Sequence, residues 1–365
     1  MYTKNILMTG STGFLGSFIL KNILDETCHN VFLLIRAKNQ DEALIRLKKL
    51  IFRIYKEDRF TRYNKRLEVF CGDQTQSCLG LSRKKYFSLF KKINEIYHCA
   101  ALTEFNEPWE KVYKVNVCGT ENIFKFAYSC NKFTKLNYIS TAFVVGNSRI
   151  HFTEVDLSTN QNFNNTYEKS KYEAELLAKD FIKKGLKIAI YRPSIVVGDY
   201  LSGETTNFRM FYKPFRSLSL GLFAELPLNK DGYLNLIPVD YAARAIFTLA
   251  ENEDSAEVYH IVNPRHFSLP YLMDFAADFF GYKNPKFISL GEFDSNHLTA
   301  IQKKILKIYL PYFTYGALFF SEKTQKILAR HHFFYPDTSK GFLERIFNFC
   351  IKSGYINSKK LNKVF

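Results

Sequence analysis

The sequence offers little for disulfide or metal chemistry and has no apolar run long enough to cross a membrane. Its seven cysteines include no Cys-x-x-Cys pair and no metal-like spacing with histidine, so we expect reduced, mostly buried thiols and no metal site. The most membrane-like stretch, residues 305–320, is broken by Lys307 and Pro311 and is shorter than the roughly 20 residues that a spanning helix needs. We expect a buried helix there, with an interfacial helix at a membrane surface as the alternative.

Signals for secretion and for nucleic-acid binding are also missing. A predicted strand begins within a few residues of the N-terminus, in place of an apolar signal core with a cleavage site. The net charge is +16, but the basic residues are scattered and form no arginine-rich run. We therefore expect a cytoplasmic protein that binds anionic partners, such as phosphorylated substrates, carriers or a membrane surface, and no nucleic acid. The sequence carries no indication of an oligomeric state.

The pattern that is present is one of short apolar runs separated by amphipathic stretches. With 365 residues and 47% hydrophobic content, the chain can bury a sizeable core. Near-continuous apolar strands need crossover helices and indicate a parallel sheet covered on both faces. The predicted fold class is therefore α/β, a doubly wound parallel sheet of the Rossmann type. The predicted strands cover residues 5–9, 31–36, 67–73, 95–100, 135–141, 187–193 and 258–262.

The regular alternation loosens after Pro193, where glycines and prolines interrupt the segments. We expect a nucleotide-binding domain over residues 1–265, with a substrate-loop insertion at about 200–230. A smaller, mostly helical substrate lobe is expected over residues 266–365.

Two helices frame the predicted site. Asn106-Glu107-Pro108 combines a capping residue with an early proline and predicts a helix through about Ser129. Asn165 or Thr166 is expected to cap a second helix, which ends at Gly185.

Three glycines follow the first predicted strand and open a helix, which is the context that a dinucleotide-binding turn requires. Glycines permit the tight turn and the approach of a pyrophosphate to the backbone, and the helix N-terminus favours the phosphate charge. The first gap is one residue longer than in the usual Gly-x-Gly-x-x-Gly pattern, and a turn without a ligand is the alternative. The residues expected to contact the dinucleotide here are Gly10, Thr12, Gly13, Phe14, Leu15 and Gly16.

The end of the second strand favours NADPH. Many NAD-binding enzymes carry an acidic residue here that bonds the ribose diol, but this sequence reads Ile35-Arg36-Ala37-Lys38. Arg36 can pair with a 2′-phosphate, and Lys38 or Arg46 can add charge. We expect NADPH to be preferred over NADH, with an ordinary surface role for Arg36 as the alternative.

Tyr167 and Lys171 are one helical turn apart and therefore share a helix face. The ammonium is expected to lower the pKa of the phenol, so that Tyr167 can exchange a proton with a substrate oxygen. An accidental match on a solvated helix face is the alternative in a chain rich in tyrosine and lysine. Thr141 ends the fifth strand, where its hydroxyl can donate to a substrate carbonyl, and Ser140 is its competitor.

The ends of the third and fourth strands are expected to flank the adenosine. The Asp73 carboxylate can accept a hydrogen bond from the adenine amine, although a turn cap is an equal alternative. Ala100 and Ala101 follow the fourth strand beside the adenosine ribose. His98 in the same strand is more typical of a core histidine than of a catalytic base.

Together these features resemble an extended short-chain dehydrogenase/reductase over roughly residues 5–265. The motifs that carry this resemblance are Thr9-Gly10-x-x-Gly13-x-x-Gly16, Gly72-Asp73, Ala100-Ala101, Asn116-Val117-x-Gly119-Thr120, Ser140-Thr141, Tyr167-x-x-x-Lys171 and Arg192-Pro193. A narrower set is similar to the thioester reductase and fatty acyl-CoA reductase (male sterility-like) branch. This set is Leu33-Leu34-Ile35-Arg36-Ala37, Leu79-Gly80-Leu81-Ser82, Tyr97-His98-Cys99-Ala100-Ala101, Tyr191 to Asp199 and Pro238-Val239-Asp240-Tyr241.

The resemblance implies a role for each matching residue. Its catalytic triad is Thr141, Tyr167 and Lys171, and the lysine also bonds the nicotinamide ribose. Asn116 shapes the helix that lets a water join a proton relay. The cofactor contacts implied at and after the Arg192-Pro193 motif, which ends the sixth predicted strand, are Pro193, Ser194 and Ile195.

The expected function is NADPH-dependent reduction of an acyl thioester, on coenzyme A or an acyl-carrier protein, to an aldehyde or alcohol. The aromatic content of 16% is dense in the C-terminal third and suits an acyl tunnel. No carrier or adenylation domain precedes the reductase motifs, so we expect a substrate that is not tethered to this chain. The alternatives are a nucleotide-sugar epimerase or dehydratase, a hydroxysteroid-like dehydrogenase, and a non-catalytic dinucleotide sensor.

Overall fold

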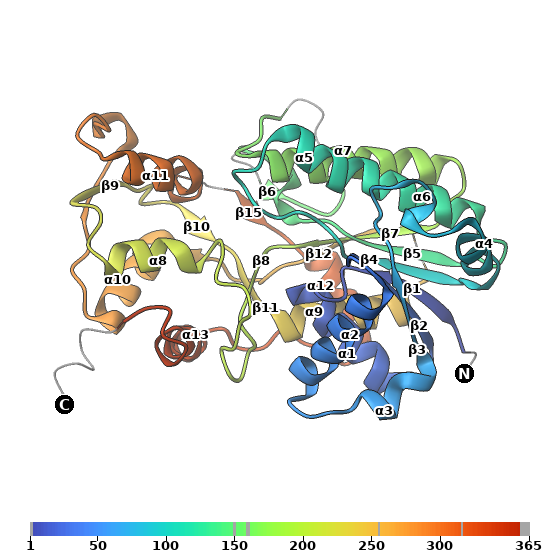
Figure 1. Ribbon diagram of the computed structural model, residues 1–365. Coiled ribbons are helices and arrows are strands. Elements are labelled where there is room, and N and C mark those ends of the chain that lie inside the picture. Colours follow the sequence, from blue (N-terminus) through green and yellow to red (C-terminus); the bar gives the residue numbers. More distant parts are fainter. Residues whose placement is uncertain (1–2, 149–150, 158–160, 255, 315–316, 358–365) are drawn as a thin grey trace.

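A parallel sheet forms the centre of the computed structural model, which describes residues 3–148, 151–157, 161–254, 256–314 and 317–357. Across these residues the strands lie in the order β12–β7–β5–β4–β1–β2–β3 (Figure 1). All neighbouring strands are parallel, and the order in which the chain adds strands to the sheet reverses between β1 and β4, the position at which a doubly wound sheet binds a nucleotide. The strands are β1 (Asn5–Thr9), β2 (Asn30–Ile35), β3 (Leu67–Cys71), β4 (Glu95–His98), β5 (Lys135–Ile139), β7 (Ile188–Pro193) and β12 (Val258–Ile261).

Successive residues of each strand point into two different cores, as the pleat requires. In β1, Ile6 and Met8 enter one core and Leu7 enters the other. The first core is covered by α1 (Phe14–Glu26), α2 (Gln40–Tyr55), α3 (Phe60–Tyr63), α9 (Val239–Asn252) and α12 (Glu322–Arg330). The opposite side of the sheet carries α4 (Arg83–Lys92), α5 (Trp109–Tyr113), α6 (Gly119–Ser129) and α7 (Thr166–Lys183) (Figure 1). The predicted doubly wound fold is confirmed, with every predicted strand within two residues of its observed ends.

The helix predicted over residues 106–129 is interrupted. A π-helical turn at Lys114–Cys118 separates α5 from α6. The start also differs from the prediction, because Pro108 occupies the cap position of α5 and no side chain caps that helix. The helix α7 begins as predicted, with Asn165 as the capping residue.

A second, aromatic-rich core lies beside the carboxyl ends of the strands (Figure 1). Its helices are α8 (Tyr212–Ser219), α10 (Leu269–Phe280), α11 (Ala300–Phe313) and α13 (Lys340–Lys352). Short strand pairs join this lobe to the main sheet or brace it internally. These pairs are β6 (His151–Phe152) with β15 (Leu318–Phe319), β8 (Ile195–Val197) with β11 (Leu236–Pro238), β9 (Glu225–Pro227) with β14 (Lys286–Ile288), and β10 (Tyr233–Leu234) with β13 (Phe267–Ser268).

The membrane-like stretch of the sequence is largely α11, which contains Pro311 and buries Leu306, Tyr309 and Tyr312. In the part of the chain that the structure describes, every helix is too short or too polar to traverse a bilayer.

The chain returns to the main sheet after α11. In α12, Ile327 and Leu328 pack into the core beneath the sheet. The buried His260 in β12 contacts this segment at two points. Its backbone N–H donates to Thr324 Oγ1 at 3.1 Å, and its Nδ1 lies 2.8 Å from the Phe320 carbonyl oxygen. The division of the chain at residue 265 stays a prediction.

Candidate active site

The glycine turn between β1 and α1 is shaped by close backbone contacts. Gly10 has a φ of +73°, and a Cβ atom there would lie 2.5 Å from the Ala100 nitrogen. A Cβ atom at Gly16 would overlap the Gly10 carbonyl oxygen. The Gly13 amide donates to that same oxygen at 2.9 Å, which closes the turn just before α1 begins at Phe14. The first amides of α1 are therefore presented to the mouth of the turn.

Two buried hydroxyls lie at the same edge of the sheet. Ser11 lies in the turn, and Ser194 follows β7 and lines the cleft. Across the residues described, the hydroxyl oxygens of both serines lack a hydrogen-bond partner. Leaving such a group unsatisfied costs about 1–3 kcal/mol, so a polar ligand in the cleft would stabilise the Ser194 hydroxyl. The turn and this hydroxyl suit the polar groups of a nicotinamide dinucleotide.

Basic side chains from α2 surround the turn. Arg46 donates to the Arg36 carbonyl oxygen and lies 3.5 Å from Thr12 Oγ1. Arg53 donates to the Thr12 carbonyl oxygen at 3.1 Å and lines the cleft. Arg53 was not among the residues predicted from the sequence. Its separation of seven residues from Arg46, two turns on one helix face, is the signal that could have identified it.

The residues expected beside the adenosine occupy the ends of β3 and β4. Asp73 Oδ1 accepts hydrogen bonds from the Thr75 amide and hydroxyl, both at 2.8 Å. This carboxylate therefore closes a local turn, and its role toward adenine stays a prediction. Ala100 packs against Gly10, and Ala101 lines the cleft.

His98 is a satisfied core histidine, as expected. Its ring nitrogens contact Thr9 Oγ1 at 2.7 Å and Thr120 Oγ1 at 2.9 Å. Burial lowers the pKa of His98 to about 3, which leaves the ring neutral and unsuited to a role as catalytic base at neutral pH.

The structure brings the three predicted catalytic side chains into one cleft with a volume of about 470 Å³. Thr141 follows β5, and Tyr167 and Lys171 lie on the first turns of α7. The Thr141 hydroxyl donates to the Pro193 carbonyl oxygen at 3.3 Å and lies close enough to the Tyr167 phenol to affect its pKa. Its competitor Ser140 points away and donates to Glu175 Oε1 at 2.5 Å.

The pKa of Tyr167 differs from the expectation. Burial in the cleft raises it to about 12, and the neighbouring Thr141 hydroxyl opposes that rise. The expected lowering by Lys171 is wrong for this structure because the ammonium is engaged elsewhere. Lys171 Nζ donates to the Ile139 carbonyl oxygen at 2.7 Å and lies 4.2 Å from the centre of the Tyr138 ring.

Lys171 itself is deeply buried, at 2% exposed. Burial lowers its pKa to about 7, and the nearby Glu175 carboxylate opposes that fall. The charge of this lysine therefore changes close to neutral pH.

Asn116 lies in the π-helical turn between α5 and α6, and its side chain is fully engaged. It accepts from the Leu102 amide at 2.7 Å and donates to the Leu102 carbonyl oxygen at 2.9 Å. It also donates to Ser170 Oγ at 2.8 Å, which connects the turn to α7. Single π turns are frequent at functional sites, but the implied water relay through Asn116 stays a prediction.

The cleft also contains residues that the sequence analysis did not single out. Glu168 follows Tyr167 and is fully buried, and burial raises its pKa to about 7. Phe105 from the loop after β4 and Tyr312 from α11 line the wall that faces the substrate lobe. Glu168 is part of the Tyr167 motif and could have been noticed, whereas Tyr312 is more than 140 residues from that motif and gave no signal.

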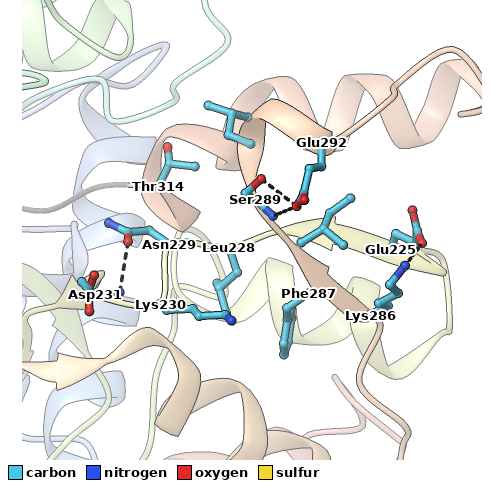
Figure 2. Close-up of a pocket in the computed structure, with 12 residues that line it drawn as sticks. Glu225, Leu228, Asn229, Lys230, Asp231, Lys286, Phe287, Ser289, Glu292 and Thr314 are labelled. Carbon is cyan, nitrogen blue, oxygen red and sulfur yellow. Dashed lines mark hydrogen bonds and ion pairs between the residues drawn. The ribbon is translucent and has the colours of Figure 1, made fainter.

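A larger hollow of about 840 Å³ lies in the substrate lobe, and four of its polar side chains are joined in two pairs (Figure 2). Lys286 pairs with Glu225 at 3.1 Å, and Ser289 donates to Glu292 at 2.8 Å. The cleft at the glycine turn is therefore the stronger candidate.

Comparisons with known proteins agree with this geometry. Residues 8–246 match the family described as male sterility protein, an NAD-binding family. One of the chains of linear gramicidin synthase from Brevibacillus parabrevis is 31% identical over 71% of this chain, and carboxylic acid reductase from Mycobacterium marinum is 27% identical over 72%. The chain spans only 5% and 24% of the lengths of these two relatives.

Solved structures show the same architecture. The terminal R domain from the myxalamid PKS-NRPS biosynthetic pathway is 26% identical, with a TM-score of 0.84 over 98% of this chain and 93% of that chain. UDP-glucuronic acid 4-epimerase from Bacillus cereus, at 18% identity and a TM-score of 0.67 over 96% of this chain and 99% of that chain, shares the fold alone. The chain thus belongs to the male sterility protein family, within the extended short-chain dehydrogenase/reductase class of NAD(P)-dependent oxidoreductases.

Proposed function

We propose that the protein reduces an acyl thioester with NADPH and releases an aldehyde. The observation that carries this proposal is the convergence of Thr141, Tyr167 and Lys171 in the one cleft that the glycine turn also lines. The names of the relatives, a carboxylic acid reductase and the terminal R domain of a PKS-NRPS biosynthetic pathway, support a thioester carbonyl as the target.

A reduced nicotinamide bound over the glycine turn would supply hydride to the thioester carbonyl carbon. Thr141 and Tyr167 donate hydrogen bonds to the carbonyl oxygen as negative charge develops there. Tyr167 then gives its proton to that oxygen, which forms the hemithioacetal. When the carbon–sulfur bond breaks, the hydroxyl proton returns to Tyr167, and the departing thiolate takes one proton from solvent to become a thiol.

The pKa values of the cleft suit this direction of reaction. A phenol with a pKa of about 12 is protonated at neutral pH and can act as the donor that a reductase needs. Lys171 shares the cleft, and its positive charge would favour the phenolate that remains after the transfer. A second hydride transfer at the same groups would convert the aldehyde to an alcohol.

Cofactor preference is assigned to the basic side chains near the turn. We propose that Arg36 and Arg46 hold the 2′-phosphate of NADPH, because the Arg46 side chain contacts both Arg36 and Thr12. Arg53 would stabilise the turn for either cofactor through its hydrogen bond to the Thr12 carbonyl oxygen. Further contacts are proposed for Gly10, Gly13, Phe14, Leu15, Gly16, Asp73, Ala100, Ala101, Asn116, Pro193, Ser194 and Ile195.

The substrate side of the cleft is apolar and suits an acyl group. Its lining includes Phe105, Phe143, Met210, Phe211 and Tyr312. We propose that the acyl chain enters along this wall and that the thioester belongs to a phosphopantetheine-type arm, which coenzyme A and acyl-carrier proteins share.

The test compares wild type with Tyr167→Phe. Each protein is incubated with NADPH and an acyl-coenzyme A, an acyl-carrier protein or a nucleotide sugar, while NADPH absorbance and product mass are followed. We expect aldehyde from at least one thioester arm and a loss of about a thousandfold in turnover in the variant, with NADPH binding retained. Full turnover by the variant would refute the assignment, and isomerised sugar without NADPH consumption would identify an epimerase.

A further inference from the structure

A tyrosine hydroxyl from the substrate lobe contacts the first turn of α7, the helix that carries Tyr167. Tyr312 on α11 is 5% exposed. Its hydroxyl donates to Glu168 Oε1 at 2.6 Å and accepts from Asn165 Nδ2 at 2.7 Å. These two partners lie on either side of Tyr167 in the sequence.

The partners of Tyr312 are the side chains that cap α7. Asn165 Oδ1 accepts from the Glu168 amide at 2.9 Å, and Glu168 Oε2 accepts from the Asn164 amide at 3.0 Å. Capping side chains fix the path of a helix start. The Tyr312 hydroxyl therefore joins both sides of the turn that carries Tyr167.

The Tyr312 ring makes a second connection to the catalytic phenol. Phe105 stacks on Tyr312 with a centroid distance of 5.3 Å and on Tyr167 with a distance of 6.0 Å. The three rings form a stack in the order Tyr312, Phe105, Tyr167. The orientation of the catalytic ring consequently depends on a side chain that the substrate lobe contributes.

We propose that Tyr312 is a positioning residue that couples the seating of α11 to the alignment of Tyr167. This inference rests on the catalytic role given to Tyr167 under Proposed function. The same helix also faces the substrate side of the cleft. Tyr309 and Phe313 of α11 line a small apolar cavity together with Ile195, which also lines the cleft. An acyl group that orders α11 would thereby order the catalytic turn.

The experiment separates the hydroxyl from the ring. Tyr312→Phe removes the bonds to Glu168 and Asn165 but keeps the stack, and Phe105→Leu removes the stack but keeps the bonds. Tyr282→Phe is the matched control, because Tyr282 lies in the same lobe and its buried hydroxyl has no partner within the described part of the chain. Turnover, thioester KM, NADPH affinity and deuterium exchange of the first turn of α7 are measured for each variant.

We expect Tyr312→Phe to lower kcat about 10- to 100-fold, since small misplacements of a catalytic group have effects of this size. Thioester KM and NADPH affinity should stay within about twofold, and exchange in the first turn of α7 should rise. Phe105→Leu should also lower kcat, which keeps the proposal testable if Tyr312→Phe does not fold. Tyr282→Phe should match wild type.

Two results would overturn the proposal. The first is that Tyr312→Phe has the same kcat, and the same deuterium exchange in the first turn of α7, as Tyr282→Phe. The second is that kcat falls only in proportion to the fraction of Tyr312→Phe that fails to fold. Either result, obtained while Tyr167→Phe still abolishes turnover, removes the role of Tyr312 and leaves the proposed function intact. Full activity of Tyr167→Phe would instead remove the proposed function.

Discussion

Glu175 and Arg192 form an ion pair in which both side chains are 1% exposed and Oε2 lies 2.8 Å from Nη2. The other Glu175 oxygen accepts from Ser140 at 2.5 Å. Ser140 directly precedes Thr141, and Arg192 directly precedes Pro193. One carboxylate on α7 therefore holds the ends of β5 and β7 beside the helix that carries Tyr167, and its charge also counteracts the effect of burial on the pKa of Lys171.

Glu175→Gln should change the pH dependence of the reaction. Without this carboxylate the pKa of Lys171 is expected to fall below about 7, so that the ammonium is lost at lower pH. The alkaline limb of kcat/KM should then shift to lower pH than in wild type. Initial rates between pH 5.5 and 9 measure this shift.

A matched control is Glu95→Gln, which removes another 1% exposed carboxylate. Glu95 pairs with Lys4 at 2.9 Å at the start of β4, the opposite edge of the sheet from the cleft. It should lower stability without moving the pH profile. If both variants leave the alkaline limb where it is in wild type, Glu175 has no electrostatic role. Replacing both Glu175 and Arg192 by Gln avoids an unpaired buried charge if the single variant does not fold.

Lys171→Met should change how stability depends on pH. The pKa of Lys171 is about 7 in the folded chain and 10.5 as the ordinary value. Between these values the unfolded state binds more protons, so rising pH stabilises the wild-type fold. The free energy of unfolding of wild type, relative to the variant, should therefore increase from pH 7 to pH 10.

Urea unfolding at pH 6, 8 and 10 gives this comparison. Lys169→Met replaces an exposed lysine on the same helix and should follow the wild-type slope. An identical slope for Lys171→Met and wild type would contradict the burial of a titrating ammonium. Turnover by Lys171→Met should be lost at every pH.

Gly10→Ala should abolish dinucleotide binding. The added methyl group combines an unfavourable positive φ with a collision against the Ala100 backbone. Gly221→Ala isolates the first effect, because Gly221 has a φ of +66° and open space around the site of its Cβ atom. We expect a cost of about 1–2 kcal/mol for Gly221→Ala and a larger one for Gly10→Ala. Cofactor titration and thermal unfolding measure both, and equal behaviour of the two variants would show that the close approach is not needed.

The arginines should separate cofactor preference from turn stability. Arg36→Ala and Arg46→Ala should raise KM for NADPH about 10- to 100-fold, the size of a lost charge-assisted hydrogen bond, with little change for NADH. Arg53→Ala should weaken both cofactors alike, since Arg53 contacts the Thr12 carbonyl oxygen in the turn itself. Equal losses with both cofactors in Arg46→Ala would remove the proposed phosphate contact.

Local patterns were enough to predict the sheet, the glycine turn and the start of α7. These features depend on residues close in sequence, such as the apolar run at Asn5–Thr9 and the capping side chain of Asn165. The wrong sign for the pKa of Tyr167 has a different origin. It depends on burial and on where the Lys171 ammonium finds an acceptor, and both are set by tertiary packing.

Contacts between distant segments could not be predicted for the same reason. Tyr312 reaches Glu168 across 144 residues, and no periodicity in either segment encodes their meeting. The break between α5 and α6 was also missed, because a π turn adds one residue to an otherwise continuous helical pattern.

The return of the chain through α12 restricts where the protein can be shortened. Tyr241 on α9 stacks on Phe333 with a centroid distance of 4.9 Å and packs edge-on against Tyr335 at 4.6 Å. Both partner rings follow α12 in the sequence. A polypeptide that ends at residue 265 would lack these two rings and α12, which cover this face of the sheet. The exposed aromatic face would favour aggregation, so cofactor binding is better studied on a chain that keeps its C-terminal segment.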